Sequence, residues 1–171
     1  MQHIDLYCER LNGDFWAEPV NALTNAAFLI GHSTLRLGAM SDVDRPANAG
    51  EIDAMAKVVE EAMQSGATGF STGLIYAPNK AAPTDEIVAL AEVAGGKGGI
   101  YVTHMRNEGV DIDKSLDETF EIGRRASLPV VVSHHKCAGK ENHGRSAETL
   151  ARFDKALKGQ KVGLDVYPYT A

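Results

Sequence analysis

The sequence predicts an α/β fold: a partial (β/α)8 barrel of the TIM type, with about four parallel strand–helix units. Two observations predict it. From about residue 50, a helical pattern followed by a short apolar run recurs four times, and the apolar runs start near residues 67, 99, 130 and 162. Each run is almost continuously apolar, as in parallel strands covered on both faces. Alternating helices and strands with short links form parallel βαβ units.

The helices are predicted from apolar residues spaced three and four positions apart, which place one apolar stripe on each helix. They cover about 52–64, 84–94, 113–126 and 146–158. Thr84 is the expected N-cap of the second helix, with Asp85 and Glu86 in its first turn. The expected buried residues are Ile52, Met55, Val59, Ala62, Met63, Ile87, Leu90, Ala91, Ala94, Leu116, Phe120, Gly123, Leu150, Phe153 and Leu157.

The strands are expected at 67–71, 99–104, 130–134 and 162–166. An open doubly wound sheet and a closed barrel both fit such a repeat. The position of the polar side chains favours the barrel, because barrel enzymes build their sites at the carboxyl ends of several strands. Four such residues lie at or just after these strand ends: Tyr76, His104, His134 and Tyr167.

Composition excludes several functional classes. The net charge of −6 offers no basic face for nucleic acid or anionic lipid. The longest apolar stretch, 26–30, is too short to span a bilayer, and the first residues lack a signal-peptide pattern. The two cysteines, Cys8 and Cys137, suggest no disulfide framework. We therefore expect a reduced cytoplasmic protein that binds neither nucleic acid nor membrane.

Two histidines are the candidate metal ligands. His104 and His134 end consecutive strands and lie one strand–helix unit apart, so both imidazoles are expected at the same rim. Zinc suits imidazole ligands, but a catalytic zinc site needs at least three protein ligands. His135 should point the opposite way from His134, and His143 lies in a glycine-rich loop. The chain therefore offers an incomplete metal shell.

Other polar residues near the rim allow two interpretations each. Lys136 could hold a substrate carboxylate or be a solvated loop lysine. Arg106 and Glu108 could form a rim salt bridge. Tyr76 and Tyr167 offer hydroxyls for an oxyanion or a carboxylate, and Tyr167 also fits a stiff turn before Pro168. The glycine-rich run 66–73 lacks the lysine and spacing of a phosphate loop, so nucleotide binding is rejected there.

Five sequence motifs follow one another between residues 31 and 171: Gly31-His32-Ser33-Thr34-Leu35-Arg36, Gly69-Phe70-Ser71-Thr72-Gly73-Leu74-Ile75-Tyr76, Tyr101-Val102-Thr103-His104-Met105-Arg106-Asn107-Glu108, Ser133-His134-His135-Lys136 and Asp165-Val166-Tyr167-Pro168-Tyr169-Thr170-Ala171. In these motifs, residues 31–171 resemble the N-acyl-D-amino-acid deacylases, or D-aminoacylases, of the amidohydrolase superfamily. The resemblance implies a zinc-bearing β/α barrel that hydrolyses the amide bond of N-acyl-D-amino acids. It implies zinc ligation by His104 and His134, and a substrate site lined by Tyr76, Lys136 and Tyr167, with Lys136 facing the carboxylate.

The same resemblance implies that the chain is a central fragment. The family's early His-x-His pair and its bridging cysteine precede the matching stretch, and its catalytic aspartate follows it. No catalytic residue is therefore assigned here, and the chain alone is expected to be inactive. The alternative is a non-catalytic α/β module that self-associates through the open edges of its sheet, since unpaired strand edges favour association.

Residues 1–30 are interpreted as a segment of different origin. Two stretches, 3–10 and 16–25, resemble the amino-terminal segment of the alkaline ceramidase-like membrane hydrolases. The resemblance implies a calcium-binding segment, and a fused or mis-joined reading frame is the simpler explanation. The residues that would match its calcium-binding positions are Asp5, Glu9, Asn12 and Glu18.

Overall fold

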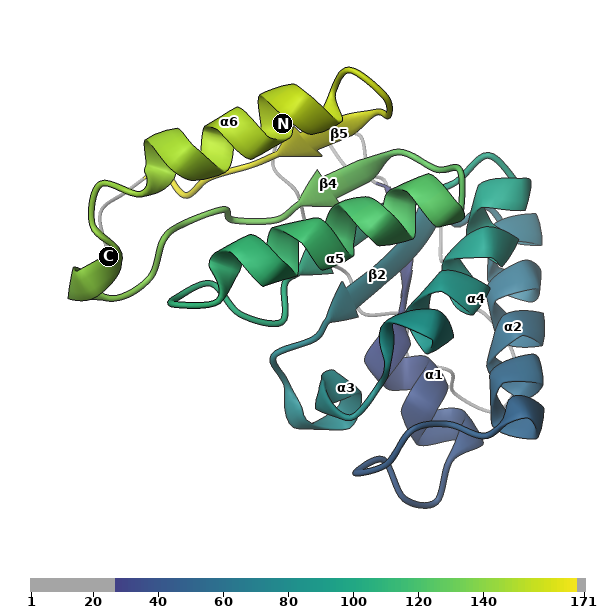
Figure 1. The fold of residues 1–171 in the computed structure, drawn as a ribbon. Helices are drawn as coiled ribbons and strands as arrows, with labels where there is room; N and C mark the ends of the chain where they lie inside the picture. Colours follow the sequence, from purple (N-terminus) through teal and green to yellow (C-terminus); the bar gives the residue numbers. More distant parts are fainter. Residues whose placement is uncertain (1–26, 169–171) are drawn as a thin grey trace.

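The computed structural model describes residues 27–168 as one parallel sheet with helices between the strands (Figure 1). The segment proposed to be of different origin, with its candidate calcium ligands, lies almost wholly outside the described residues. In order, the elements are β1 (Leu29–Gly31), α1 (His32–Ala39), α2 (Ala49–Gln64), β2 (Gly69–Gly73), α3 (Ala77–Lys80), α4 (Thr84–Gly96), β3 (Ile100–His104), α5 (Ile112–Arg125), β4 (Val130–Val132), the 3-10 turn η1 (Lys140–Asn142), α6 (Ser146–Ala156) and β5 (Val162–Leu164).

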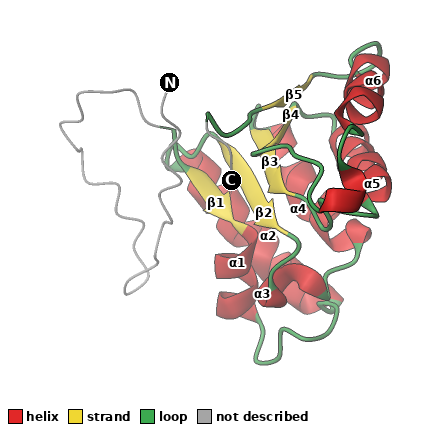
Figure 2. Cartoon of the chain, turned by 90° about the vertical axis from the view of Figure 1, so that its left-hand side faces the viewer, coloured by secondary structure: helices red, strands yellow, loops and turns green. Residues whose placement is uncertain are grey.

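The strands pair in the order in which the chain runs, β1-β2-β3-β4-β5, and every pair is parallel. Right-handed crossovers between successive parallel neighbours place all connecting helices on the same face of the sheet. Figure 2 shows the helices gathered on one side of the strands. A doubly wound sheet would carry helices on both faces. The arrangement is therefore that of a partial β/α barrel, as predicted.

The two faces of the sheet differ in burial. On the helix-covered face, Phe70, Tyr101 and Val130 are aligned by the strand register and are at most 1% exposed. On the opposite face, the aligned residues Ser71, Val102 and Val131 are half-buried. The alternation along each strand explains this difference. The hydrophobic core of the described residues therefore lies between the sheet and its helices.

Close packing of strands and helices depends on glycines at two contacts. A Cβ atom at Gly69 would lie 2.1 Å from the carbonyl oxygen of Ile100 on the neighbouring strand. A Cβ atom at Gly123 would lie 2.2 Å from Cγ2 of Val130, so this glycine lets α5 approach β4. Neither position can accept a side chain without moving backbone or core atoms.

The structure adds one strand that the repeat did not predict. β1 pairs with β2 and passes directly into α1, so the chain joins the sheet from residue 29. This strand runs across the boundary expected between residues 30 and 31. A three-residue strand followed at once by a helix gives too short a periodic signal to detect. The division of the chain into segments of two origins stays a prediction.

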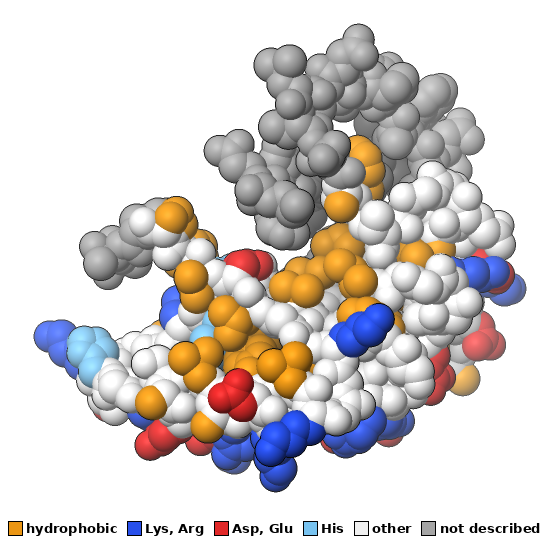
Figure 3. All heavy atoms as spheres, turned by 90° about the horizontal axis from the view of Figure 1, so that it is seen from above, with side chains coloured by type: hydrophobic (Ala, Val, Ile, Leu, Met, Phe, Trp, Pro, Cys, Tyr) orange, Lys and Arg blue, Asp and Glu red, His pale blue; other side chains and the backbone are white. Residues whose placement is uncertain are grey.

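Two local predictions are wrong. The residue at the N-cap of α4 is Pro83, and Thr84 lies inside the helix, where its hydroxyl donates to Glu118 at 2.9 Å. On α6, Leu150 is 46% exposed and Leu157, which caps the helix, is 54% exposed, whereas Phe153 is buried. Only the Phe153 side of this helix packs against α5 and the end of the sheet. Figure 3, seen from the α6 and β5 side, shows hydrophobic side chains gathered at the surface.

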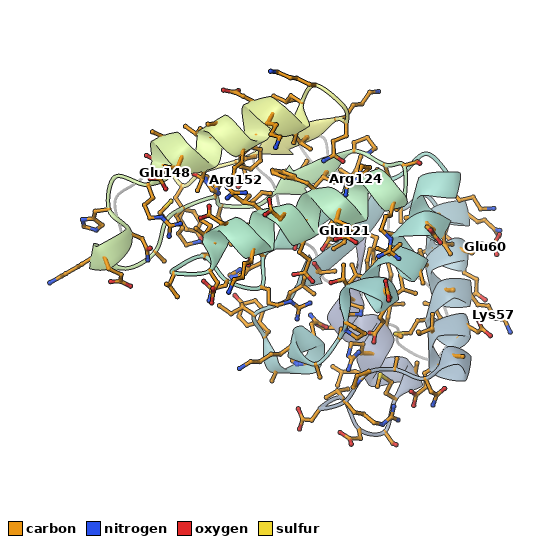
Figure 4. The ribbon with its side chains drawn as sticks, in the orientation of Figure 1. Lys57, Glu60, Glu121, Arg124, Glu148 and Arg152 are labelled. Carbon is orange, nitrogen blue, oxygen red and sulfur yellow. The ribbon has the colours of Figure 1, made fainter. Side chains whose placement is uncertain are left out.

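Charged side chains cover the outer surfaces of the helices. In Figure 4, Lys57 and Glu60 project from α2, Glu121 and Arg124 from α5, and Glu148 and Arg152 from α6. Some of these charges pair across helices: Arg152 lies 2.8 Å from Asp117, and Glu60 lies 2.9 Å from Lys97. Such exposed pairs contribute little to stability. Within residues 27–168, no helix combines the length and the apolar composition that a membrane crossing requires.

One ionic cluster is buried at the start of the fold. Glu86 accepts hydrogen bonds from Arg36, from His32 at 3.0 Å and from the backbone N–H of Ala47 at 3.0 Å. Arg36 also donates to the carbonyls of Val43 and Arg45 at 2.8 and 2.6 Å, and to that of Pro78. The side chains of His32, Arg36 and Glu86 are all fully buried. Through Arg36, the cluster therefore connects Glu86 on α4 with the loop after α1 and with α3.

Candidate metal centre

Three side chains converge at the carboxyl end of the sheet: His104, Glu108 and His134. His104 is the last residue of β3, Glu108 follows four residues later, and His134 lies two residues beyond β4. The two imidazole rings meet edge to face, with centroids 4.4 Å apart. One potential ligand atom from each of the three residues lies within 4.8 Å of the others. Adjacent parallel strands deliver these residues to one place because their carboxyl ends share one edge.

His104 is flanked by Tyr76, the N-cap residue of α3, which follows the end of β2. The Tyr76 hydroxyl lies 3.4 Å from Nδ1 of His104, and the two ring centroids are 5.0 Å apart. A Cβ atom at Gly73 would lie 2.7 Å from Cδ2 of the Tyr76 ring, so the absence of a side chain there lets the ring fold back over the strand end. Tyr76 is 55% exposed and therefore marks the solvent side of the centre.

His134 has an unusual backbone conformation, with φ of 45°. Its N–H donates to Oδ1 of Asp165 at 2.5 Å, and Oδ2 of the same carboxylate lies 3.3 Å from the hydroxyl oxygen of Ser133. Asp165 follows β5, so the strand next to β4 secures this turn. The sequence analysis did not identify Asp165 as a site residue, because its contact is with backbone rather than with the imidazole.

Glu108 lies between three nitrogen-bearing groups. Its carboxylate oxygens lie 2.9 Å from His134 Nδ1, 2.6 Å from Lys136 Nζ and 3.7 Å from His104 Nε2. The Glu108 side chain is only 7% exposed, whereas that of Lys136 is 37% exposed. Lys136 Nζ also lies 2.9 Å from His134 Nδ1 and 3.1 Å from the carbonyl oxygen of the same histidine. The ammonium therefore neutralises a carboxylate that would otherwise be buried unpaired.

Burial lowers the pKa of His104, and the nearby charges of His134 and Lys136 act in the same direction, while the Glu108 carboxylate opposes them. A lowered pKa keeps the imidazole neutral, which is the form that binds a metal ion. Nε2 of His104 is buried and forms no hydrogen bond. The donor set of two imidazoles beside a carboxylate fits zinc in chemistry and in spacing.

The structure brings together all five residues that the sequence analysis selected. Tyr167 stacks on His134, with ring centroids 5.5 Å apart, and the Lys136 ammonium lies 5.3 Å from the centre of the Tyr167 ring. The four rings thus contact one another in the order Tyr76, His104, His134 and Tyr167.

The remaining candidates lie elsewhere. His135 points to α6, where its Nε2 lies 2.9 Å from the hydroxyl oxygen of Thr149, and His143 is exposed in a loop. The rim salt bridge that Arg106 and Glu108 could have formed with each other is not made. Arg106 pairs with Glu118 on α5 at 2.9 Å, and Glu108 pairs with Lys136 instead. Glu108 is the group that sequence reasoning misplaced, because its partners come from the loop after the next strand.

The chain resembles proteins of one family. It is 51% identical to the D-aminoacylase of Alcaligenes xylosoxydans xylosoxydans over 150 residues, which are 88% of this chain and 31% of that protein. A solved D-aminoacylase, described as having a binuclear metal centre, matches with a TM-score of 0.83 at 50% identity, over 85% of this chain and 31% of that one. No protein-family model matches the chain.

A second enzyme of this kind gives the same result. The N-acyl-D-glutamate deacylase of Bordetella bronchiseptica, solved with zinc and a phosphonate inhibitor that mimics the tetrahedral intermediate, matches with a TM-score of 0.83 at 42% identity. The match covers 87% of this chain and 32% of that one. The resemblance to the D-aminoacylases drawn from the sequence is thereby confirmed. The chain spans about a third of the length of each of these relatives.

Proposed function

We propose that the chain carries part of the active site of a zinc-dependent amidohydrolase that cleaves the amide bond of N-acyl-D-amino acids. One observation carries the proposal: two imidazoles converge beside an ammonium and two tyrosines at the carboxyl end of a parallel sheet. The supporting comparison is the close match to a segment of D-aminoacylases. The small-molecule substrate class is the one that the names of these relatives state.

In this proposal, His104 and His134 hold the metal. A bound zinc ion would polarise the acyl carbonyl and lower the pKa of a water molecule. Tyr76 is placed to donate a hydrogen bond to an oxyanion or a carboxylate, because its hydroxyl lies next to His104 on the solvent side. The proton-transfer residue of the family is, by the resemblance, an aspartate outside the matched stretch, so none of the described residues is assigned that role.

Lys136 and Tyr167 are proposed to receive the carboxylate of the substrate. The Lys136 side chain reaches solvent, and its ammonium lies close to the Tyr167 ring. A cation at this place would orient an N-acyl-D-amino acid with its carboxylate away from the bond to be cleaved. The proposed location is the cytoplasm, on the basis of cysteine usage in the sequence.

The test is zinc binding followed by ligand binding with the 171-residue chain. We expect weak zinc uptake, because two ligands bind a metal far less tightly than three or four. We expect N-acetyl-D-methionine to shift the NMR signals of Lys136 and Tyr167 more than its L-enantiomer does, with little or no hydrolysis. Absence of zinc binding, or equal shifts with both enantiomers, would contradict the proposal. Normal turnover by this chain would contradict the expected need for residues outside it.

A further inference from the structure

We propose that residues 1–26 of this chain dock on the open face of the sheet, which is the face opposite the helices (Figure 2). The open face carries the half-buried side chains of Leu29, Ser71, Ile100, Val102 and Val131. In a complete β/α barrel, side chains from all eight strands fill the space beside this face. The described residues supply five strands, so the apolar groups of the open face need another cover.

The open face is apolar in the middle of the sheet and has room beside β5. Ile100 and Val102 on β3, and Val131 on β4, point to it because they alternate with residues buried under the helices. Gly163 on β5 is aligned with Val131. A Cβ atom at Gly163 would meet no atom of the described residues within 4 Å. A covering segment can therefore approach this part of the sheet closely.

The sequence of residues 1–26 suits such a cover. Four of its large apolar residues recur at intervals of three and four positions, a pattern typical of a segment with one apolar side. The large apolar residues of the segment are Ile4, Leu6, Tyr7, Leu11, Phe15, Trp16, Val20 and Leu23.

Charge favours the same location. Residues 1–26 contain four carboxylates and one arginine, which gives the segment a net charge of −3. Lys161 is exposed just before β5, and its carbonyl oxygen accepts the N–H of Val130 at 2.9 Å. Alternation along the strand places Lys161 on the same side as Gly163, which is the open face. Its ammonium can therefore pair with a carboxylate of the covering segment.

The segment starts from a fixed place at the edge of the open face. The N–H and the hydroxyl of Thr68 donate to the carbonyl oxygen of Phe28 at 2.7 and 2.9 Å, so the chain is held where it enters β1. Five strands span about 20 Å, at about 4.8 Å for each spacing. Residues 1–26 would reach about 40 Å even as a helix. A tethered segment acts at a roughly millimolar effective concentration, which favours it over a second copy of the chain.

Fluorescence gives the first test, because Trp16 is the single tryptophan of the chain. We expect its emission at a shorter wavelength, and its quenching by acrylamide to be weaker, than in the urea-unfolded chain, at every protein concentration. Val102→Asp should move the emission to longer wavelength. Val110→Asp, at a residue that is 71% exposed, is the matched control and should keep the wild-type emission. Wild-type emission equal to that of the unfolded chain, or emission that depends on concentration, would overturn the proposal.

A second variant changes the segment instead of the sheet, because Val102→Asp could unfold the protein. Phe15→Asp should shift the methyl NMR signals of Val102 and Val131. The methyl signals of Val59, which is fully buried between the sheet and its helices, should stay in place. Unchanged signals of Val102 and Val131 in a folded Phe15→Asp chain would contradict docking on the open face.

Nuclear Overhauser contacts decide which occupant covers the face. In the full wild-type chain we expect contacts between the Trp16 ring and the methyl groups of Val102 or Val131. Isotope-filtered spectra of mixed labelled and unlabelled chains separate contacts within one molecule from contacts between two copies. Contacts within one molecule would support the proposal. Contacts found only between copies, or none to this face, would overturn it.

Discussion

Oδ1 of Asp165 accepts a hydrogen bond from the backbone N–H of His134 at 2.5 Å. His134 needs this support, because it is a non-glycine residue in the left-handed region, where a side chain costs about 1–2 kcal/mol. The bond joins the end of β5 to the turn after β4 and so sets the direction of the His134 ring.

Removal of this bond should loosen the metal centre. We expect Asp165→Ala to lower zinc affinity by about tenfold or more, as loss of outer-shell support typically does. Asp165→Asn should recover most of the affinity, because its side-chain oxygen can still accept from His134. Isothermal titration calorimetry measures both, with the exposed α6 residue substitution Asp154→Ala as the control. Equal zinc affinity in Asp165→Ala and the wild type would show that the turn holds without the carboxylate.

The three neighbouring histidines 104, 134 and 135 should behave differently when replaced by alanine. His104→Ala and His134→Ala should each abolish zinc uptake. His135→Ala should leave zinc uptake nearly unchanged, since that ring bonds to Thr149 and packs on Phe153, with centroids 5.3 Å apart. It should instead lower the free energy of unfolding by about 1–3 kcal/mol. Zinc titration and urea unfolding separate the two effects, and loss of zinc in His135→Ala would place that residue in the centre.

Acid should destabilise the fold through the buried cluster around Glu86. Burial opposes ionisation of Glu86, but hydrogen bonds from His32, Arg36 and the Ala47 N–H lower its pKa from 4.5 to about 2. Its stabilising contribution is thus complete above pH 4.5 and is lost as the pH falls toward 2. Burial also lowers the pKa of His32 below 6.5, so the unfolded chain takes up that proton first and stability falls below this pH as well.

Urea unfolding across this pH range tests the cluster. We expect the free energy of unfolding to decrease steadily from neutral pH downward. Glu86→Gln should be less stable at neutral pH and should show a shallower decrease at acidic pH. The exposed residue substitution Glu148→Gln serves as the control. Parallel pH profiles in Glu86→Gln and the wild type would rule out this carboxylate as the source of the acid sensitivity.

Self-association is the remaining prediction. Within residues 27–168, β1 and β5 each pair with one strand, and β5 is half-buried along its length. Leu150 on α6 and Leu157 at its end are 46% and 54% exposed. We expect concentration-dependent dimers or larger species in sedimentation velocity, reduced by the double substitution Leu150→Ser with Leu157→Ser. A single monomeric boundary at all concentrations would contradict the prediction.

Periodicity in the sequence was enough to find the helices α2, α4, α5 and α6 and the strands β2 to β5, because each carries a regular apolar stripe or run. It also placed His104 and His134 at the same end of the sheet, because the carboxyl ends of neighbouring parallel strands share one edge. Periodicity did not predict the roles of Glu108 and Asp165. Their roles depend on contacts between loops after different strands, and no spacing rule within one segment encodes such contacts.

The pairing of β1 to β5 in chain order has a consequence for how the protein forms. Each strand pairs with the next strand along the chain, so every strand pair joins segments that are close in sequence. Loop closures of this size carry a modest entropic cost. Folding can then advance one unit at a time from the amino-terminal side during synthesis. On this route the metal centre is assembled late, once the turn after β4 meets the strand that secures it.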